Sequence, residues 1–88
     1  MLTKEFVIVN KLGLHARASA LFVKLASRFN CEVKLAKEHI EVNGKSIMGI
    51  MMLAASKGTK IRLTVEGTDE TEAMQVIGAL IEDGFGEE

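Results

Sequence analysis

His15 and Arg17 are the residues whose chemistry stands out, because they lie two positions apart where an extended segment gives way to a helical one. A neutral imidazole is a nucleophile, and the positive end of a helix disfavours its protonated form. The N–H groups of Ala16 and Arg17 would donate to phosphoryl oxygens, and the Arg17 guanidinium would add a planar set of donors. The segment therefore predicts that His15 holds a phosphoryl group, and the alternative is a His15 that merely caps the helix.

The elements on either side of His15 follow from hydrophobic spacing. Residues 4–9 are β-branched and aromatic-rich and predict a strand, and the polar, turn-prone residues 10–13 predict a loop. Apolar side chains then recur at helical spacing over residues 16–29, with the charged ones on other faces. This arrangement places His15 at the start of the first helix.

The middle of the chain predicts a hairpin followed by a short helix. Residues 32–36 and 39–43 alternate apolar and polar side chains and are joined by a short link at 37–38. Ser46 is expected to cap a helix over residues 47–53. Because two helical turns cannot bury every apolar side chain, we expect Ile50 and Leu53 inside and part of the rest exposed.

The last third predicts one more strand and one more helix. Residues 57–59 restart extended structure, and residues 61–65 alternate as a half-buried strand. Residues 68–70 are expected to supply an N-cap and acidic first-turn residues for a helix that runs to Gly84, and residues 85–88 are expected to form a loose tail. The order βαββαβα predicts an α+β open-faced β-sandwich, in which three helices cover one face of a four-stranded antiparallel sheet. We expect one domain over residues 1–88.

Composition argues against several classes of function. The formal net charge is −1 and the chain has no Trp or Tyr, which disfavours binding to nucleic acid or to a membrane. A single cysteine, Cys31, and no charged-then-apolar leader indicate a cytoplasmic chain with a buried, inert thiol. We expect no metal and no cofactor, and we assign no function to His39.

Two motifs in combination resemble the HPr family, the phosphocarriers of the bacterial phosphoenolpyruvate-dependent sugar phosphotransferase system. They are residues 13–17, Gly-Leu-His-Ala-Arg, and residues 45–51, Lys-Ser-Ile-Met-Gly-Ile-Met. The resemblance covers essentially the whole chain. It implies that His15 takes a phosphoryl group from Enzyme I and passes it to Enzyme IIA proteins for sugar uptake. Such a chain is a phosphohistidine transfer intermediate and not an independent catalyst.

The second motif carries further implications of the same resemblance. Ser46 would be phosphorylated by the ATP-dependent HPr kinase/phosphorylase as part of carbon catabolite regulation, whereas the plainer interpretation is a helix cap. Ile47, Met48 and Met51 would form a patch that docks several partners in turn. Lys24 and Lys45 would steer acidic partners, or else belong to a solvated face.

The chain also departs from the family pattern, which often has a small polar residue at position 12 and Pro-Ala after the arginine. Leu12 cannot cap a helix through its side chain, and Ala18-Ser19 lack the rigidity of proline. Three alternatives stay open: a regulatory phosphocarrier of NPr type or of a chain without permeases, a small acylphosphatase-type enzyme, and a non-catalytic binding module. We expect a monomer.

Overall fold

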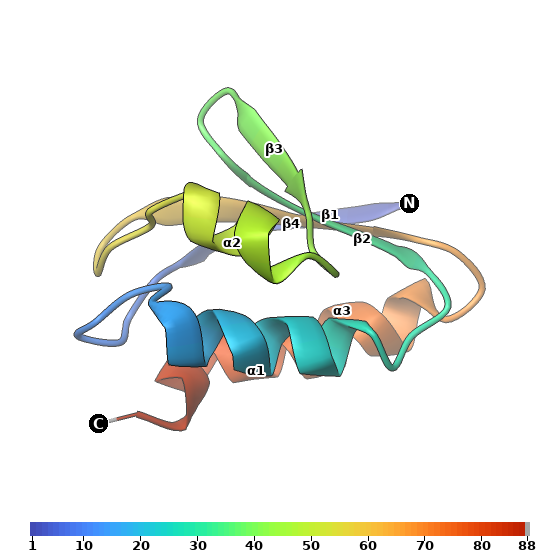
Figure 1. Cartoon of the computed structure of the whole chain (residues 1–88). Coiled ribbons are helices and arrows are strands. Elements are labelled where there is room, and N and C mark those ends of the chain that lie inside the picture. Colours follow the sequence, from blue (N-terminus) through green and yellow to red (C-terminus); the bar gives the residue numbers. More distant parts are fainter. Residues whose placement is uncertain (88) are drawn as a thin grey trace.

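The computed structural model describes residues 1–87 and has the predicted element order (Figure 1). The elements are β1 (Leu2–Val7), α1 (Ala16–Ala26), β2 (Glu32–Lys37), β3 (Ile40–Asn43), α2 (Ile47–Met52), β4 (Lys60–Glu66), α3 (Glu70–Glu82) and a 3-10 turn, η1 (Gly84–Gly86). The βαββαβα prediction is confirmed. No helix within residues 1–87 is long and apolar enough to cross a membrane.

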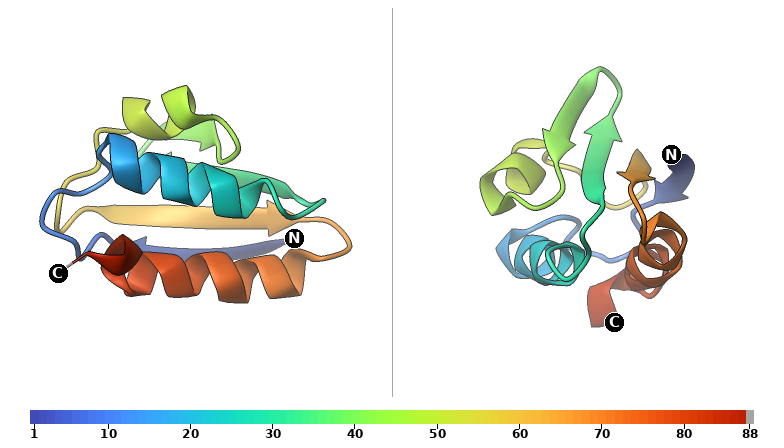
Figure 2. Two further views of the ribbon diagram at one scale, coloured as in Figure 1. Left: turned by 60° about the horizontal axis from the view of Figure 1, so that its bottom comes forward. Right: turned by 90° about the vertical axis from the view of Figure 1, so that its right-hand side faces the viewer.

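The four strands form one sheet in the order β1-β4-β2-β3, with every neighbouring pair antiparallel. Alternation sends Ile61, Leu63 and Val65 of β4 to the buried face and the intervening residues to the other. The helices lie together on the buried side, as both views of Figure 2 show. The open-faced sandwich is therefore confirmed, and its covered face places the start of α1 at one end of the sheet.

The core fills the space between the sheet and the helices. Ala18 and Phe22 of α1 and Ala73, Ile77 and Ile81 of α3 are buried, as the helical spacing predicted, and Ala26 is buried with them. Of the other apolar residues at the same spacing, Leu25 and Leu80 are only partly buried and Val76 is exposed. Fully burying one Leu, Ile or Phe side chain stabilises the fold by roughly 1.5–3 kcal/mol. The two helices that carry these stripes are thus fixed against the sheet, and α1 is a rigid support for whatever lies at its N-terminus.

Several predicted boundaries were wrong by a few residues. The first strand is Leu2–Val7 instead of 4–9, although Ile8 still exchanges backbone hydrogen bonds with Gly58 and Thr59. Helix α1 ends at Ala26 instead of residue 29, because Arg28 and Phe29 donate to carbonyls only three residues back, which tightens the chain into a turn. Helix α2 ends one residue before the predicted Leu53.

The two loops beside the sheet also differ from the prediction. Strand β3 begins at Ile40, so His39 lies in the two-residue turn of the hairpin and not in a strand. Residues 57–58 form a turn, and β4 starts at Lys60 instead of restarting at residue 57. Short turns leave no periodicity to follow, which is why sequence spacing placed these boundaries poorly.

The C-terminal segment is the largest departure. Residues 84–86 form a turn of 3-10 helix and Phe85 is only 2% exposed, so the predicted loose tail was wrong for the part of the tail that the structure describes. Glu88 lies outside the described residues. The burial of Phe85 holds the end of the chain against the N-terminal end of α1 (Figure 1).

Candidate functional site

The loop before α1 is shaped by close backbone contacts. Gly13 donates its N–H to the Asn10 carbonyl at 3.1 Å, and Leu14 donates to the Ala55 carbonyl at 2.9 Å. Gly13 has a φ of +64°, and a Cβ at this position would lie 2.4 Å from the Ala55 carbonyl oxygen. Only glycine fits there, because the left-handed region disfavours a side chain and the approach leaves no room for one.

His15 follows directly and occupies the N-cap position of α1. Its backbone is extended, its side chain makes no capping hydrogen bond, and its carbonyl accepts from the Ser19 N–H at 2.8 Å. Within residues 1–87, the N–H groups of Ala16, Arg17 and Ala18 have no hydrogen-bond partner. The ring is therefore not used to cap the helix, and the first-turn donors are available to an anion.

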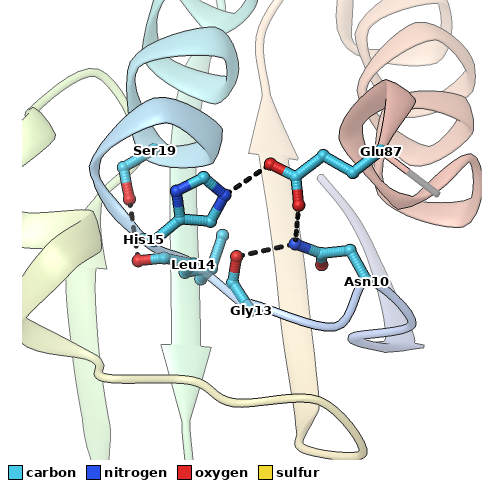
Figure 3. A network of polar contacts seen from close by, with 6 residues as sticks. All are labelled: Asn10, Gly13, Leu14, His15, Ser19 and Glu87. Carbon is cyan, nitrogen blue, oxygen red and sulfur yellow. Dashed lines mark hydrogen bonds and ion pairs between the residues drawn. The ribbon is translucent and has the colours of Figure 1, made fainter.

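The residues that depart from the family pattern have structural roles of their own. Ala18 is fully buried and packs in the core. Ser19 is also fully buried, and its hydroxyl donates to the Leu14 carbonyl at 3.1 Å (Figure 3). This bond ties the residue before His15 to the first turn of α1, which supplies a constraint where proline is absent. Leu12 is exposed beside the site.

A residue that sequence reasoning missed, Glu87, lies against the imidazole. Its carboxylate accepts hydrogen bonds from His15 Nε2 and, at 2.9 Å, from Asn10 Nδ2 (Figure 3). The hydrogen bond from Asn10, that from His15 and, more weakly, the charge of Arg17 hold the pKa of the Glu87 carboxyl below its ordinary value. The one available indication in the sequence was an aromatic residue, Phe85, in a segment expected to be solvated.

These groups surround one cavity of about 610 Å³ at the surface. It is lined by Lys11, Leu12, His15, Arg17, Phe85, Gly86 and Glu87. The His15 side chain is 27% exposed and therefore reachable from solvent. Arg17 is exposed and forms no ion pair within residues 1–87, so its guanidinium remains available. The structure brings His15, Arg17 and the free first-turn amides together, as the first motif predicted.

Ser46 lies at the start of α2, and its hydroxyl oxygen accepts from the Gly49 N–H at 3.2 Å. The predicted cap is confirmed. Helix α2 runs beside α1 in the opposite direction (Figures 1 and 2), with Lys45 donating to the Phe29 carbonyl at one end and Leu14 donating to the Ala55 carbonyl at the other. Ser46 therefore lies at the end of α2 that is farther from His15.

Helix α2 exposes an apolar surface between these two positions. Ile50 and Leu53 are buried, as predicted. Ile47, Met48 and Met51 are exposed, with Met48 at 70%. Exposed apolar side chains gathered on one short helix are a feature of protein-binding surfaces. The structure thus places all three predicted docking residues at the surface.

The other residues considered in the sequence, two lysines, His39 and Cys31, do not line the His15 cavity. Lys24 is exposed in the last turn of α1, whereas the Lys45 ammonium is held by the Phe29 carbonyl at 2.7 Å. His39 is exposed in a turn. Cys31 is buried as expected, and burial together with a hydrogen bond to Asp69 raises the pKa of its thiol. Residues 1–87 contain no cluster of three or more side chains able to hold a metal ion.

Asp69 begins α3 but does not cap it through its side chain, contrary to the expected cap within residues 68–70. Its carboxylate instead accepts the N–H groups of Asn30 and Cys31 at 2.8 and 2.9 Å. The hydrogen bond from Asn30, followed by the bonds from Cys31, lowers the pKa of Asp69. Asp69 therefore fixes the loop that leads into β2 and lies outside the His15 site.

Comparison with known proteins gives consistent matches over the full chain. A family model described as the PTS HPr component phosphorylation site matches residues 2–83. The phosphocarrier protein HPr of Neisseria meningitidis serogroup B is 56% identical over 87 residues, covering 99% of this chain and 98% of the relative. That of Xylella fastidiosa strain 9a5c is 50% identical over 88 residues, covering 100% and 99%. A crystal structure of HPr from Thermoanaerobacter tengcongensis superposes with a TM-score of 0.96 at 49% identity, covering 100% and 99%.

Proposed function

Because the chain belongs to the HPr family of phosphocarrier proteins in the phosphotransferase system, we propose that His15 is the residue that carries the phosphoryl group. The observation that supports this most strongly is the surface cavity lined by His15 and Arg17, which lies at the start of a helix whose first three N–H groups have no partner within residues 1–87. A nucleophile and anion-binding donors are both needed for phosphoryl transfer, and here they lie together.

The reaction at His15 starts from the ring nitrogen that is not occupied. Nε2 is engaged by Glu87, so Nδ1 supplies the electron pair, and it lies on the side of the ring nearer the first turn of α1 (Figure 3). A bond forms between Nδ1 and phosphorus while the bond from phosphorus to the donor group on Enzyme I breaks, and that electron pair stays on the donor. The reverse exchange passes the phosphoryl group to an Enzyme IIA protein.

The site is expected to stabilise the phosphorylated form of His15 only weakly. Interactions of a charge with an exposed helix terminus contribute about 0.3–1 kcal/mol each, and Arg17 adds charge-assisted hydrogen bonds from an exposed side chain. A carrier must release what it accepts, and these weak, solvent-accessible contacts suit release. The protein is accordingly a transfer intermediate that takes part in each cycle as a substrate of its partners.

Partner binding is assigned to the surface beside the cavity. Ile47, Met48 and Met51 are exposed, and the flexible Met side chains would let this surface contact Enzyme I and Enzyme IIA proteins in turn. Lys24 is exposed and free to steer an acidic partner, whereas the engaged ammonium of Lys45 is less suited to this. We propose that residues 1–88 form one domain, which carries both the docking surface on α2 and the cavity at His15.

Ser46 is proposed as a regulatory phosphorylation site for an HPr kinase/phosphorylase. A phosphate there would lie at a helix N-terminus, where negative charge is tolerated, and beside Ile47 and Met48 of the docking surface. The phosphate would carry a charge of about −1.5 to −2 at pH 7 and would repel an acidic partner. Because Ser46 lies at the end of α2 that is farther from His15, the effect on phosphate uptake would arise at the docking step.

A regulatory phosphocarrier of NPr type is the second candidate, and the Ser46 motif favours the sugar branch over it. The two are separated by incubating the protein with ATP and an HPr kinase/phosphorylase. Incorporation of one acid-stable phosphate, abolished in Ser46→Ala, supports carbon regulation. Absence of labelling with an active kinase removes that role and leaves the carrier function.

The carrier function is tested by incubation with phosphoenolpyruvate and Enzyme I, followed by mass spectrometry. We expect one acid-labile phosphoryl group on the parent and none on His15→Ala. The matched control is His39→Ala, which removes the only other histidine and should be labelled normally. Equal labelling of His15→Ala and the parent would refute the assignment.

A further inference from the structure

We propose that Glu87 is a positioning residue for phosphoryl transfer, whose carboxylate holds the imidazole of His15 with its proton on Nε2 and its free electron pair on Nδ1. The proposal rests on the assignment of His15 as the carrier residue. It adds a part of the site that is supplied by the opposite end of the chain, 72 residues away in sequence.

The turn that brings Glu87 to His15 is specifically built. Phe85 is buried and has a φ of +58°, a left-handed conformation that a residue with a side chain rarely adopts. Gly84 and Gly86 on either side also have positive φ, at +66° and +74°. The Glu87 N–H donates to the Gly84 carbonyl at 3.1 Å and closes the turn. Burial of the Phe85 ring offsets the unfavourable backbone conformation and anchors the segment.

The carboxylate is held from two sides. Asn10 is 3% exposed, and its Nδ2 donates both to the Gly13 carbonyl at 2.8 Å and to Glu87 Oε1 at 2.9 Å. Both of these partners only accept, so together they fix the orientation of the Asn10 amide. The Asn10 Oδ1 atom is buried without a partner within residues 1–87, an arrangement that is unfavourable unless the amide protons are needed where they are. Glu87 Oε1 is thereby anchored, and Oε2 is directed at His15 (Figure 3).

This geometry determines which nitrogen reacts. An ionised carboxylate can only accept, so Nε2 must carry the proton and the electron pair of the neutral ring is on Nδ1. When Nδ1 forms a bond to phosphorus, the ring gains positive charge, and the carboxylate at Nε2 stabilises it. Carboxylates that orient a histidine in this way are common behind metal-bound and catalytic histidines. Arg17 forms no ion pair with Glu87, so its guanidinium stays available to the phosphoryl oxygens.

The opposite interpretation is that Glu87 is a stand-in anion that blocks the site and must leave before phosphate enters. The two interpretations predict opposite results for removal of the carboxylate. A blocking anion predicts faster phosphorylation when it is removed, whereas a positioning residue predicts slower phosphorylation.

The experiment compares the parent with Glu87→Ala and Glu87→Gln in single-turnover transfer from phospho-Enzyme I, with 15N NMR of the His15 ring. We expect the transfer rate to fall about tenfold in Glu87→Ala, as for other histidine-orienting carboxylates, with the KM for Enzyme I unchanged. Glu87→Gln should lie in between, because one of the two oxygens that face Asn10 and His15 becomes an NH2 group, which donates and cannot accept. The hydrogen-bonded Nε2 proton signal should be present in the parent and lost in Glu87→Ala.

Glu82→Gln is the matched control, because it removes one carboxylate from an exposed position at the end of α3. It should leave the rate and the ring spectrum unchanged. An unchanged or faster rate in Glu87→Ala, or an unchanged ring spectrum, overturns the positioning role. That failure is distinct from failure of the carrier assignment, which would show as persistent labelling of His15→Ala.

Discussion

The N-termini of α1 and α2 each present a side chain that we propose to carry phosphate, yet they are built in opposite ways. At α1, the His15 side chain makes no capping bond, the first three N–H groups have no partner in the described part of the chain, and Glu87 contacts the ring. At α2, the Ser46 hydroxyl oxygen already accepts from the Gly49 N–H. The first is a helix start left open for an incoming group, whereas the second is a closed cap.

This difference explains why the two positions suit different chemistry. A phosphoryl group can enter and leave at His15 without disturbing a hydrogen bond of the helix. At Ser46 the modified atom is the capping oxygen itself, so the change alters a structural element and suits a lasting signal. The two proposed roles, transfer at His15 and regulation at Ser46, are therefore assigned to helix starts of different construction.

Two glycines next to these helix starts should show the largest difference in stability between them. Gly13→Ala is expected to destabilise the protein by about 2–4 kcal/mol, because it combines a left-handed backbone with a Cβ that would lie 2.4 Å from the Ala55 carbonyl oxygen. At Gly49 in α2, a Cβ would lie 3.2 Å from Val42 Cβ, which is a tight contact. Alanine has a helix propensity about 1 kcal/mol more favourable than glycine, and this gain would offset the cost of that contact.

Urea unfolding of Gly13→Ala and Gly49→Ala measures this difference. Gly13→Ala should show a clearly lower midpoint than Gly49→Ala and a slower transfer to His15. Equal midpoints would mean that the loop before His15 is no more constrained than the start of α2.

Removal of the cap itself should have a smaller effect. Ser46→Ala is expected to lower the free energy of unfolding by about 1 kcal/mol, because the Gly49 N–H loses its acceptor. Ser46→Asp should retain most of the stability, since aspartate is an equally good N-cap, and should still reduce phosphorylation of His15 by placing charge at the docking surface. A Ser46→Ala variant as stable as the parent would show that the second helix start is not a closed cap.

Among these changes, acidification should have the smallest effect on the stability of the protein, because it should release only the C-terminal turn. The pKa of Glu87 is lowered in the folded state, so docking of the turn is stabilised above the ordinary glutamate range and that stabilisation is lost as the pH falls through the lowered value. NMR amide shifts of Phe85 and Glu87 should change in acid before those of α1 and the sheet. A simultaneous change of all three regions would contradict independent docking of the turn.

The fold and the His15 site differ in how far the sequence predicts them. Alternation in β4 and the apolar stripe of α1 repeat over several residues, so hydrophobic spacing was sufficient to predict the elements and the position of His15 at a helix start. Glu87 has no such pattern. Its contact with His15 depends on Phe85 adopting a left-handed turn, which only packing against the completed core can stabilise.

The hydrogen-bonding roles of Asp69 and Ser19 were unpredictable for the same reason. Local propensity suggested a cap near Asp69, whereas its carboxylate binds N–H groups 38 and 39 residues away that the fold brings near. The buried hydroxyl of Ser19 reaches a carbonyl that is close only because the loop at Gly13 turns the chain into α1. The sequence therefore predicts where the candidate groups His15, Arg17 and Ser46 lie, but not which residues hold the segments around them.

The most direct test of this account is to locate the phosphoryl group by 15N and 31P NMR after transfer from phospho-Enzyme I to 15N-labelled protein. A single phosphorus bonded to Nδ1 of His15, with the proton retained on Nε2, is the predicted result. Phosphorus on Nε2, or on any other residue, would contradict the open helix start as the site of transfer.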